Sequence, residues 1–276
     1  MIDSDEYILS DKLGAGVFST VFTGTHRFTH DKVAFKRIKN DPKYLREAYR
    51  EITILNRMNN RSNHCVFYYG STKIDNFLYL IFEKLDMNLY SFQKQYSDCL
   101  NMSNVIHISY QILDALCFIH EYVIHCDLKH ENIMIDSETY HIKVIDFGSS
   151  HYIDKPKPST DYIVSRYYRP PEVVFGLPYS TKLDIWSFGC IVSELLIGAP
   201  IFPGKSQRDL IFKIASYLGI PSEPCYKNSR YFLKYFKPAY SNQCKVNECF
   251  VHSVKTFGKP YETYNEHNLK VLLFEN

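Results

Sequence analysis

The chain has 276 residues, of which 45% are hydrophobic and 22% are charged, and its formal net charge is +2. This balance is typical of a globular protein, and the length is enough for one large domain or for two lobes. The small net charge argues against nucleic acid or an anionic membrane as the main partner.

Targeting and redox features of the sequence are few. The first six residues are acidic and contain no apolar segment, so we expect no signal peptide. No apolar run approaches the length of a transmembrane helix, and the run at 77–82 has the length of a strand. The eight cysteines are scattered without a Cys-x-x-Cys pair. This predicts reduced thiols in an intracellular protein, which would be cytoplasmic, nuclear or both.

Residues 7–38 are predicted to form three strands joined by glycine-containing turns. Gly14 and Gly16 in the first turn allow the backbone to approach phosphate oxygens and to point amide hydrogens at them. Turns of the same composition also join strands that bind no ligand. Lys36 lies at the end of the alternating stretch 33–36. It is either an ordinary surface lysine or a lysine that pairs with phosphate.

A helix is predicted over 42–60, where apolar residues recur every three or four positions, at Leu45, Ala48, Ile52 and Leu55. Pro42 falls in its first turn, where the missing amide hydrogen is tolerated. Glu47 and Glu51 lie one turn apart, and either could face Lys36. We favour Glu51, since it lies beside the apolar residues. The alternative is that both glutamates lie on a solvated face.

Two further strands are predicted at 66–69 and 77–83, which completes a five-stranded antiparallel sheet. Residues 83–86 break the pattern and could offer backbone hydrogen bonds to an adenine ring. The period becomes helical from 102 to 122, with an apolar stripe of Val105, Ile108, Ile112, Leu116 and Ile119. A strand-rich first third and a helix-rich remainder predict an α+β protein with two lobes and a cleft at 83–88.

Polar residues concentrate at both ends of a predicted hairpin. Its first strand, 133–135, follows the segment 125–132, which contains Asp127, Lys129 and Asn132. Its second strand, 141–145, leads into Asp146-Phe147-Gly148. Phosphoryl transfer needs a carboxylate that orients a hydroxyl and two oxygen ligands for Mg²⁺, and this order and spacing match the catalytic and metal loops of protein kinases. The alternative is a set of solvated loop acids beside a hairpin.

The segment 149–165 is long and polar and contains tyrosine, which predicts a regulatory segment. An apolar helix is predicted from Asp184 to about Gly198. An acid within that helix must be satisfied when buried, and we expect the backbone amides of the turn at 125–127 to do so. Residues 221–263 show no clear periodicity of apolar residues. A weak last helix is predicted at 265–274.

These motifs together resemble the eukaryotic protein kinases over about residues 7–220. Three stretches resemble the CMGC group and, within it, the dual-specificity tyrosine-regulated kinases: His125-Cys126-Asp127-Leu128-Lys129, with cysteine where most kinases have arginine; 144–150; and 162–169. The resemblance implies a small lobe at 7–83, a hinge at 84–88 and a large lobe at 89–276.

The resemblance also implies roles for single residues. Asp127 would be the catalytic acid-base, Lys129 would steady the transferred phosphoryl group, and Asn132 and Asp146 would hold Mg²⁺. Lys36 and Glu51 would form an ion pair in the small lobe. The implied ATP-binding residues also include a gatekeeper, Phe82, the hinge residues Glu83 and Leu85, and Leu13, Gly14, Ala15, Gly16, Val17, Val21, Ala34 and Met134. Tyr162 would be phosphorylated, and Arg166 and Arg169 would form a substrate platform.

Four departures from the family pattern stand out. Thr160 replaces the first tyrosine of the Tyr-x-Tyr motif, His130 replaces the proline usual after the catalytic lysine, and Ser19 replaces the third glycine of the first turn. The family pairs the residue matching Glu172 with a late arginine, yet no arginine follows Arg230. Either the sequence stops short of the whole domain, or Glu172 is held in another way.

The predicted function is that of an ATP-dependent and Mg²⁺-dependent protein kinase. It would act as a monomer on serine or threonine in protein substrates, preferring proline after the acceptor. It would also phosphorylate its own Tyr162, with Arg166 as the main anchor for that phosphate. One alternative is a pseudokinase that serves as a binding scaffold, and another is a small-molecule kinase on a related fold.

Overall fold

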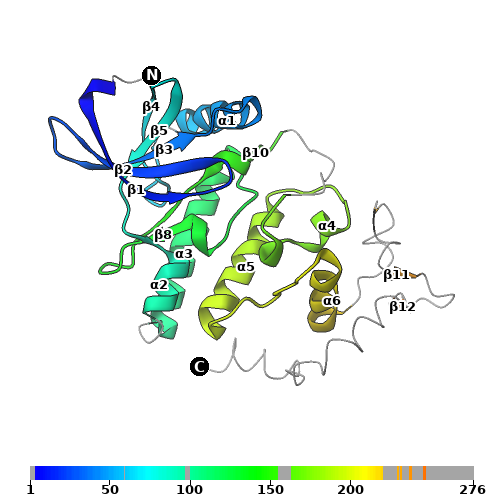
Figure 1. Ribbon diagram of the computed structural model, residues 1–276. Coiled ribbons are helices and arrows are strands. Elements are labelled where there is room, and N and C mark those ends of the chain that lie inside the picture. The colour runs from blue at the N-terminus through cyan, green and yellow to red at the C-terminus, as the bar shows by residue number, and fades with distance from the viewer. Residues whose placement is uncertain are drawn as a thin grey trace.

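Five strands form the antiparallel sheet of the first lobe (Figure 1). They are β1 (Tyr7–Ala15), β2 (Ser19–His26), β3 (Lys32–Ile38), β4 (Tyr68–Ile74) and β5 (Phe77–Glu83), in the spatial order β1-β2-β3-β5-β4. The predicted five-stranded sheet is therefore confirmed. The computed structural model describes residues 4–58, 60–96, 100–154 and 163–219, together with 229, 231, 236–237 and 245–246.

The strand predicted at 66–69 was placed wrongly, because β4 begins at Tyr68 and continues to Ile74. The first part of the predicted stretch instead contacts other segments. Val66 N donates to Val144 O at 3.0 Å, and Phe67 N donates to the Glu83 carboxylate at 2.6 Å. The polar run 71–73 in the middle of β4 conceals the alternation that would have marked it as a strand.

α1 (Pro42–Met58) is the single α-helix described in this lobe, and it lies beside the sheet and against the turn at Phe147–Ser149 (Figure 1). Ala48 and Leu55 of the predicted stripe are buried, whereas Leu45 and Ile52 are partly buried. Ile54 and Met58 are also buried, although the predicted stripe omitted them. The helix has neighbours on two sides, so its buried surface is wider than a single stripe.

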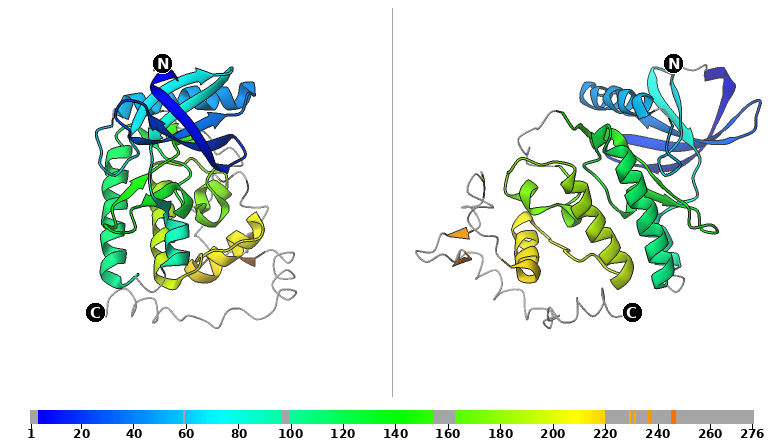
Figure 2. Two further views of the ribbon diagram at one scale, coloured as in Figure 1. Left: turned by 60° about the vertical axis from the view of Figure 1, so that its left-hand side comes forward. Right: turned by 180° about the vertical axis from the view of Figure 1, so that it is seen from behind.

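The second lobe is mostly helical and lies on the other side of the linker that follows β5 (Figures 1 and 2). Its helices are α2 (Leu89–Gln95), α3 (Met102–Ile119), α4 (Pro171–Val174), α5 (Lys182–Ile197) and α6 (Gln207–Leu218). The predicted helix from Asp184 is confirmed, although it begins two residues earlier and ends at a left-handed Gly198. The predictions for 221–263 fall mainly, and the weak helix at 265–274 wholly, outside the described residues.

α3 forms the centre of the large lobe's core. All five residues of its predicted apolar stripe are at most 3% exposed. By length and composition alone, α3 is also apolar enough to cross a membrane, but its buried face packs against α5 and β9. The stripe was therefore predicted correctly as a core-facing surface.

Short strands complete the large lobe and flank the loops that contain the polar motifs. β6 (Met87–Asn88), β8 (Ile133–Ile135) and β9 (Ile142–Val144) form one sheet, and β8 and β9 are the predicted hairpin. β7 (Val123–Ile124) pairs with β10 (His151–Tyr152), and β11 (Phe236–Lys237) pairs with β12 (Lys245–Val246). Met87 and Asn88, the last residues of the predicted hinge, belong to β6, which leaves 84–86 as the extended linker.

Candidate active site

Lys36 lies at the centre of a charged cluster that joins the two lobes. Its Nζ lies 2.8 and 2.9 Å from the two carboxylate oxygens of Glu51 and 2.7 Å from Oδ1 of Asp146. Burial opposes the charged ammonium, but Asp146 and Glu51 together raise the pKa of Lys36. The Lys36 charge in turn lowers the pKa of Asp146 to about 2. Of the two candidate glutamates, Glu51 is therefore the one that pairs with Lys36.

The register of the sheet places the predicted nucleotide-binding residues on one face. Val21 lies opposite Lys36, and Ala34 lies opposite Phe82. Residues directly opposite in an antiparallel pair, and residues two apart in one strand, point to the same side. Val21, Ala34, Lys36 and Phe82 therefore share a face, and the buried residues Val33, Phe35 and Ile81 lie on the other.

The remaining predicted nucleotide-binding residues surround that face. Leu13, Gly14 and Ala15 end β1, and Gly16 and Val17 form the turn to β2, in which Gly16 N donates to Ser19 O at 2.8 Å. Leu85 lies in the linker, and Met134 lies in β8 opposite Asn88. The Glu83 side chain accepts from Phe67 N and from Lys143 Nζ, each at 2.6 Å, so it links the segment just before β4 to β9.

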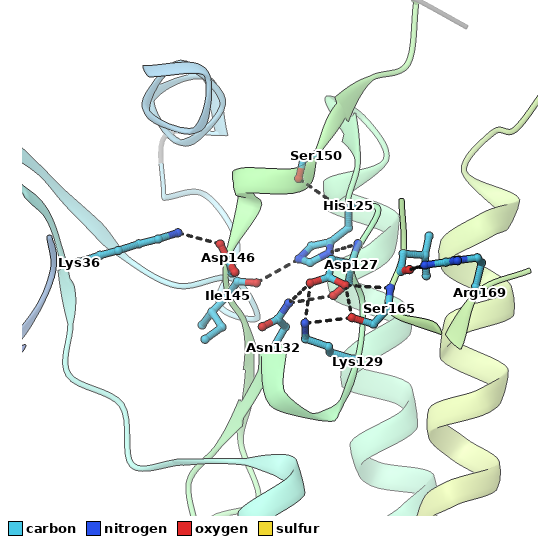
Figure 3. Close-up of polar contacts among 11 residues, drawn as sticks. Lys36, His125, Asp127, Lys129, Asn132, Ile145, Asp146, Ser150, Ser165 and Arg169 are labelled. Atoms are coloured by element: carbon cyan, nitrogen blue, oxygen red, sulfur yellow. Dashed lines mark hydrogen bonds and ion pairs between the residues drawn. The ribbon is translucent and has the colours of Figure 1, made fainter. Parts of the chain in front are cut away.

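Asp127 is held by four donors around its carboxylate (Figure 3). Oδ1 accepts from the backbone N and the hydroxyl of Ser165, at 3.1 and 2.8 Å. Oδ2 accepts from Lys129 Nζ at 2.7 Å and from Asn132 Nδ2 at 3.2 Å. Ser165 was missed by the sequence analysis, because nothing in the sequence relates it to an acid 38 residues away.

The turn that presents Asp127 depends on Asp184, as predicted. Asp184 is fully buried in α5, and its carboxylate accepts from His125 N at 2.7 Å and from Cys126 N at 3.0 Å. His120 Nε2 lies 2.9 Å from the same carboxylate. Cys126 has a φ of 65°, in the left-handed region that non-glycine residues seldom adopt. The contacts with Asp184 stabilise this turn.

The two predicted Mg²⁺ ligands, Asn132 and Asp146, lie on the side of Asp127 that faces Lys36 (Figure 3). The Asp146 side chain is 43% exposed, so part of its carboxylate is open to a ligand. The Asn132 amide donates through Nδ2 to the backbone and side chain of Asp127, an orientation that turns its oxygen away from Asp127. Two oxygen donors of this kind suit a hard divalent cation.

Arg166 and Arg169 contact backbone carbonyl groups. Arg166 Nη1 donates to Lys205 O at 2.9 Å. Arg169 is 3% exposed and donates to Val164 O from Nε at 3.1 Å and from Nη2 at 2.8 Å. Tyr162 and Thr160 lie outside the described residues, so the predicted phosphate contact of Arg166 stays a prediction.

The other departures from the family pattern leave these contacts in place. Ser19 begins β2, and His130 is buried directly after Lys129. Burial raises the pKa of Glu172, whose nearby charge is Lys182. Its expected arginine partner is not identified among the described residues.

Comparison with known proteins identifies the family. The family model described as "Protein kinase domain" matches residues 7–245 of this chain. The dual specificity protein kinase YAK1 of Saccharomyces cerevisiae is 37% identical over 271 residues, which is 94% of this chain and 33% of that protein. The YAK1 homolog of Arabidopsis thaliana is 41% identical over 242 residues, or 84% and 25%. Homeodomain-interacting protein kinase 2 of Mesocricetus auratus is 38% identical over 228 residues, or 80% and 19%.

These relatives confirm the predicted resemblance to the dual-specificity tyrosine-regulated kinases and their neighbours in the CMGC group. The chain spans a third or less of the length of each of these three relatives. A match over most of the chain, on a two-lobed fold with the charged residues assembled as described, leads to one conclusion: the chain belongs to the protein kinase family.

Proposed function

We propose that the chain transfers the γ-phosphoryl group of ATP to serine or threonine in protein substrates and uses Mg²⁺ to do so. The observation that carries this proposal is the complete polar cluster: Lys36 is paired with Glu51 and Asp146, while Asp127 is in contact with Lys129 and Asn132. A protein kinase domain uses ATP and a divalent metal, and these are the groups that phosphoryl transfer requires.

The geometry suggests a role for each group. Lys36 would pair with ATP phosphates, and Glu51 would keep its ammonium in place. Asp127 would orient the acceptor hydroxyl and take its proton, while Lys129 would offset the charge that develops on the phosphoryl oxygens. Asn132 and Asp146 would hold Mg²⁺, which would neutralise charge on the phosphates.

The contact between Arg169 and Val164 supports a preference for proline after the acceptor. Val164 has a φ of 63°, and its carbonyl accepts two hydrogen bonds from Arg169. That oxygen is therefore engaged and is a poor acceptor for an amide hydrogen of a bound peptide. Proline has no amide hydrogen that would be left without a partner, so it fits there without loss.

Autophosphorylation on Tyr162 is the second part of the proposal. It is supported by the names of two relatives, both called dual specificity protein kinases, and by the stretch 162–169, which resembles the family motif. Phosphate on Tyr162 would add about −1.5 to −2 charges near Arg166. Mass spectrometry of protein made in bacteria tests this part: phosphate at Tyr162 is expected, and active protein without phosphotyrosine would contradict it.

The scaffold alternative needs a missing or displaced catalytic group. Neither Ser19 nor His130 removes Lys36, Asp127, Asn132 or Asp146 from the cluster. The geometry therefore favours an active kinase over a pseudokinase. The polar platform formed by Ser165, Arg166 and Arg169 likewise favours a peptide acceptor over a small molecule.

One assay tests the main proposal. The purified protein is incubated with labelled ATP, Mg²⁺ and two peptides that differ only in proline or alanine after the serine. We expect label in both peptides, with more in the Ser-Pro peptide, and a loss of about a hundredfold or more with Asp127→Asn. Labelling equal to that of the Asp127→Asn protein would refute the proposed activity.

A further inference from the structure

Three polar side chains from different segments meet in a buried cluster beneath the segment 125–132. They are His130, which follows Lys129, Tyr168, which precedes Arg169, and Glu194 of α5. His130 Nδ1 lies 3.1 Å from the Tyr168 hydroxyl and 3.4 Å from Glu194 Oε2. The three residues are 0%, 6% and 4% exposed. Buried polar groups of this kind are stable only when they satisfy one another.

The hydrogen-bond directions in this cluster follow from a count of hydrogens. The Tyr168 hydroxyl has one hydrogen, and it donates it to Glu194 Oε2 at 2.9 Å. Its oxygen can therefore only accept from His130, so His130 Nδ1 must carry a hydrogen and donate it. His130 Nε2 has no hydrogen-bond partner among the described residues, so Tyr168 is the contact that orients the ring.

This cluster is one of two groups of contacts that link the segments 125–132 and 164–169. In the first group, Val164 N donates to Cys126 O at 3.1 Å, and Ser165 bonds to Asp127 and Lys129. The second link joins Tyr168 to His130, three residues beyond the Ser165–Asp127 contact along both segments. The first group holds the start of the segment 164–169, and the second link holds its end, next to Arg169. The fixed segment includes Arg169 and the Val164 carbonyl that it holds.

The second link depends on histidine at position 130. Proline, which is usual after the catalytic lysine in the resembling family, has no side-chain donor and could not bond to Tyr168. The link is therefore a feature of this sequence, and the role of His130 was not apparent from its position alone.

We propose that His130 is a positioning residue for the protein substrate, because it holds the segment 164–169 in place against Asp127 through Tyr168 and Glu194. This inference rests on the proposed kinase activity. Loss of the imidazole should impair the use of the protein acceptor more than the use of ATP, since Lys36 and the strands around it lie in the other lobe.

Steady-state kinetics with a Ser-Pro peptide test the proposal. His130→Leu keeps an apolar side chain but removes the donor, and it should raise the KM for peptide about tenfold, the effect of one net hydrogen bond. The KM for ATP should stay within about twofold. His130→Asn places an amide donor close to the former Nδ1–H and should restore the KM for peptide to within about threefold of the wild-type value.

A matched control is His64→Leu, which removes a partly buried imidazole outside the site, and neither KM should change. Tyr168→Phe removes the link from its other end and should reproduce the effect of His130→Leu, which also covers a leucine variant that fails to fold. An unchanged KM for peptide, an equal rise in both KM values, or an asparagine variant no better than leucine would each overturn the inference. A wild-type protein that transfers no phosphate would overturn the proposed function, and this inference with it.

Discussion

Asp127 shows how a single side chain is fixed by residues from several segments. Ser165 holds one of its carboxylate oxygens, and Lys129 and Asn132 hold the other. The carboxylate therefore has a fixed orientation before any substrate arrives. Catalysis by a positioned acid-base depends on such an orientation, because the group must lie within hydrogen-bond reach of the acceptor hydroxyl.

Asp127→Asn should lower kcat about a hundredfold or more while leaving the affinity for Mg-ATP within a few-fold. An amide of the same shape keeps one accepting oxygen, but its NH2 group cannot accept from the remaining donors and cannot take the proton. Kinetics and nucleotide titration of the purified variant check this. Asp114→Asn, a change at a 56% exposed carboxylate, is the control and should match the wild type. Turnover by Asp127→Asn at the wild-type rate would rule out the proposed role.

Arg169→Ala should reduce the preference for Ser-Pro over Ser-Ala peptides about tenfold, because the Val164 carbonyl would lose both of its donors. The ratio of kcat/KM values for the two peptides measures this. Arg208→Ala removes an exposed arginine of α6 and serves as the control. A ratio unaffected by Arg169→Ala would mean that Arg169 supports the fold without selecting the peptide.

At the scale of whole elements, α3 offers a direct comparison between its two faces. Ile112 is 0% exposed and Ile106 is 61% exposed on the same helix. Ile112→Ala should lower the free energy of unfolding by about 2–5 kcal/mol, since it leaves a cavity in the core. Ile106→Ala should change it by less than about 0.5 kcal/mol. Denaturant unfolding checks both, and equal losses would contradict the assignment of the buried face.

Elements with a clear period could be predicted from the sequence, and α3 is the best example. The bounds of β4 could not, because the polar residues 71–73 interrupt its pattern and because Val66, which the prediction included, bonds to β9 instead. The buried face of α1 was only partly predicted for a related reason. Its width depends on the turn at Phe147–Ser149, which is distant in the sequence.

The candidate site likewise contains residues that could be predicted from the sequence and residues that could not. Lys36, Glu51, Asp127, Asn132 and Asp146 could be identified because they fall in ordered motifs with known spacing. The contact of Ser165 with Asp127 and that of His130 with Tyr168 span 38 residues each and follow no motif. Such contacts depend on how two segments pack, which a single sequence does not specify.

For the molecule as a whole, polar contacts join the two lobes at separate places. Lys36 of β3 bonds to Asp146 of the large lobe. Within β9, Lys143 bonds to Glu83, and Val144 exchanges backbone hydrogen bonds with the segment 64–66. A nucleotide bound near Lys36 and Asp146 would therefore contact both lobes.

Mg-ATP should stabilise the wild-type protein by about 2.7 kcal/mol when it is present at a hundred times its Kd. Asp146→Ala should lose most of this stabilisation, because it removes a charged metal ligand. Thermal unfolding with and without Mg-ATP measures the effect, and ATP with a chelator is the control. A shift in Asp146→Ala equal to that of the wild type would contradict the metal role of Asp146.

The contact between Asp184 and the backbone at His125 and Cys126 also affects the order of events during synthesis. The carboxylate lies 59 residues after the first amide that it binds. At about 5–20 residues per second, a ribosome needs about 3–12 s to add that length of chain. During this interval the nascent protein already contains Asp127 but lacks the group that holds its turn. The catalytic segment is therefore completed late, after the whole small lobe has been translated.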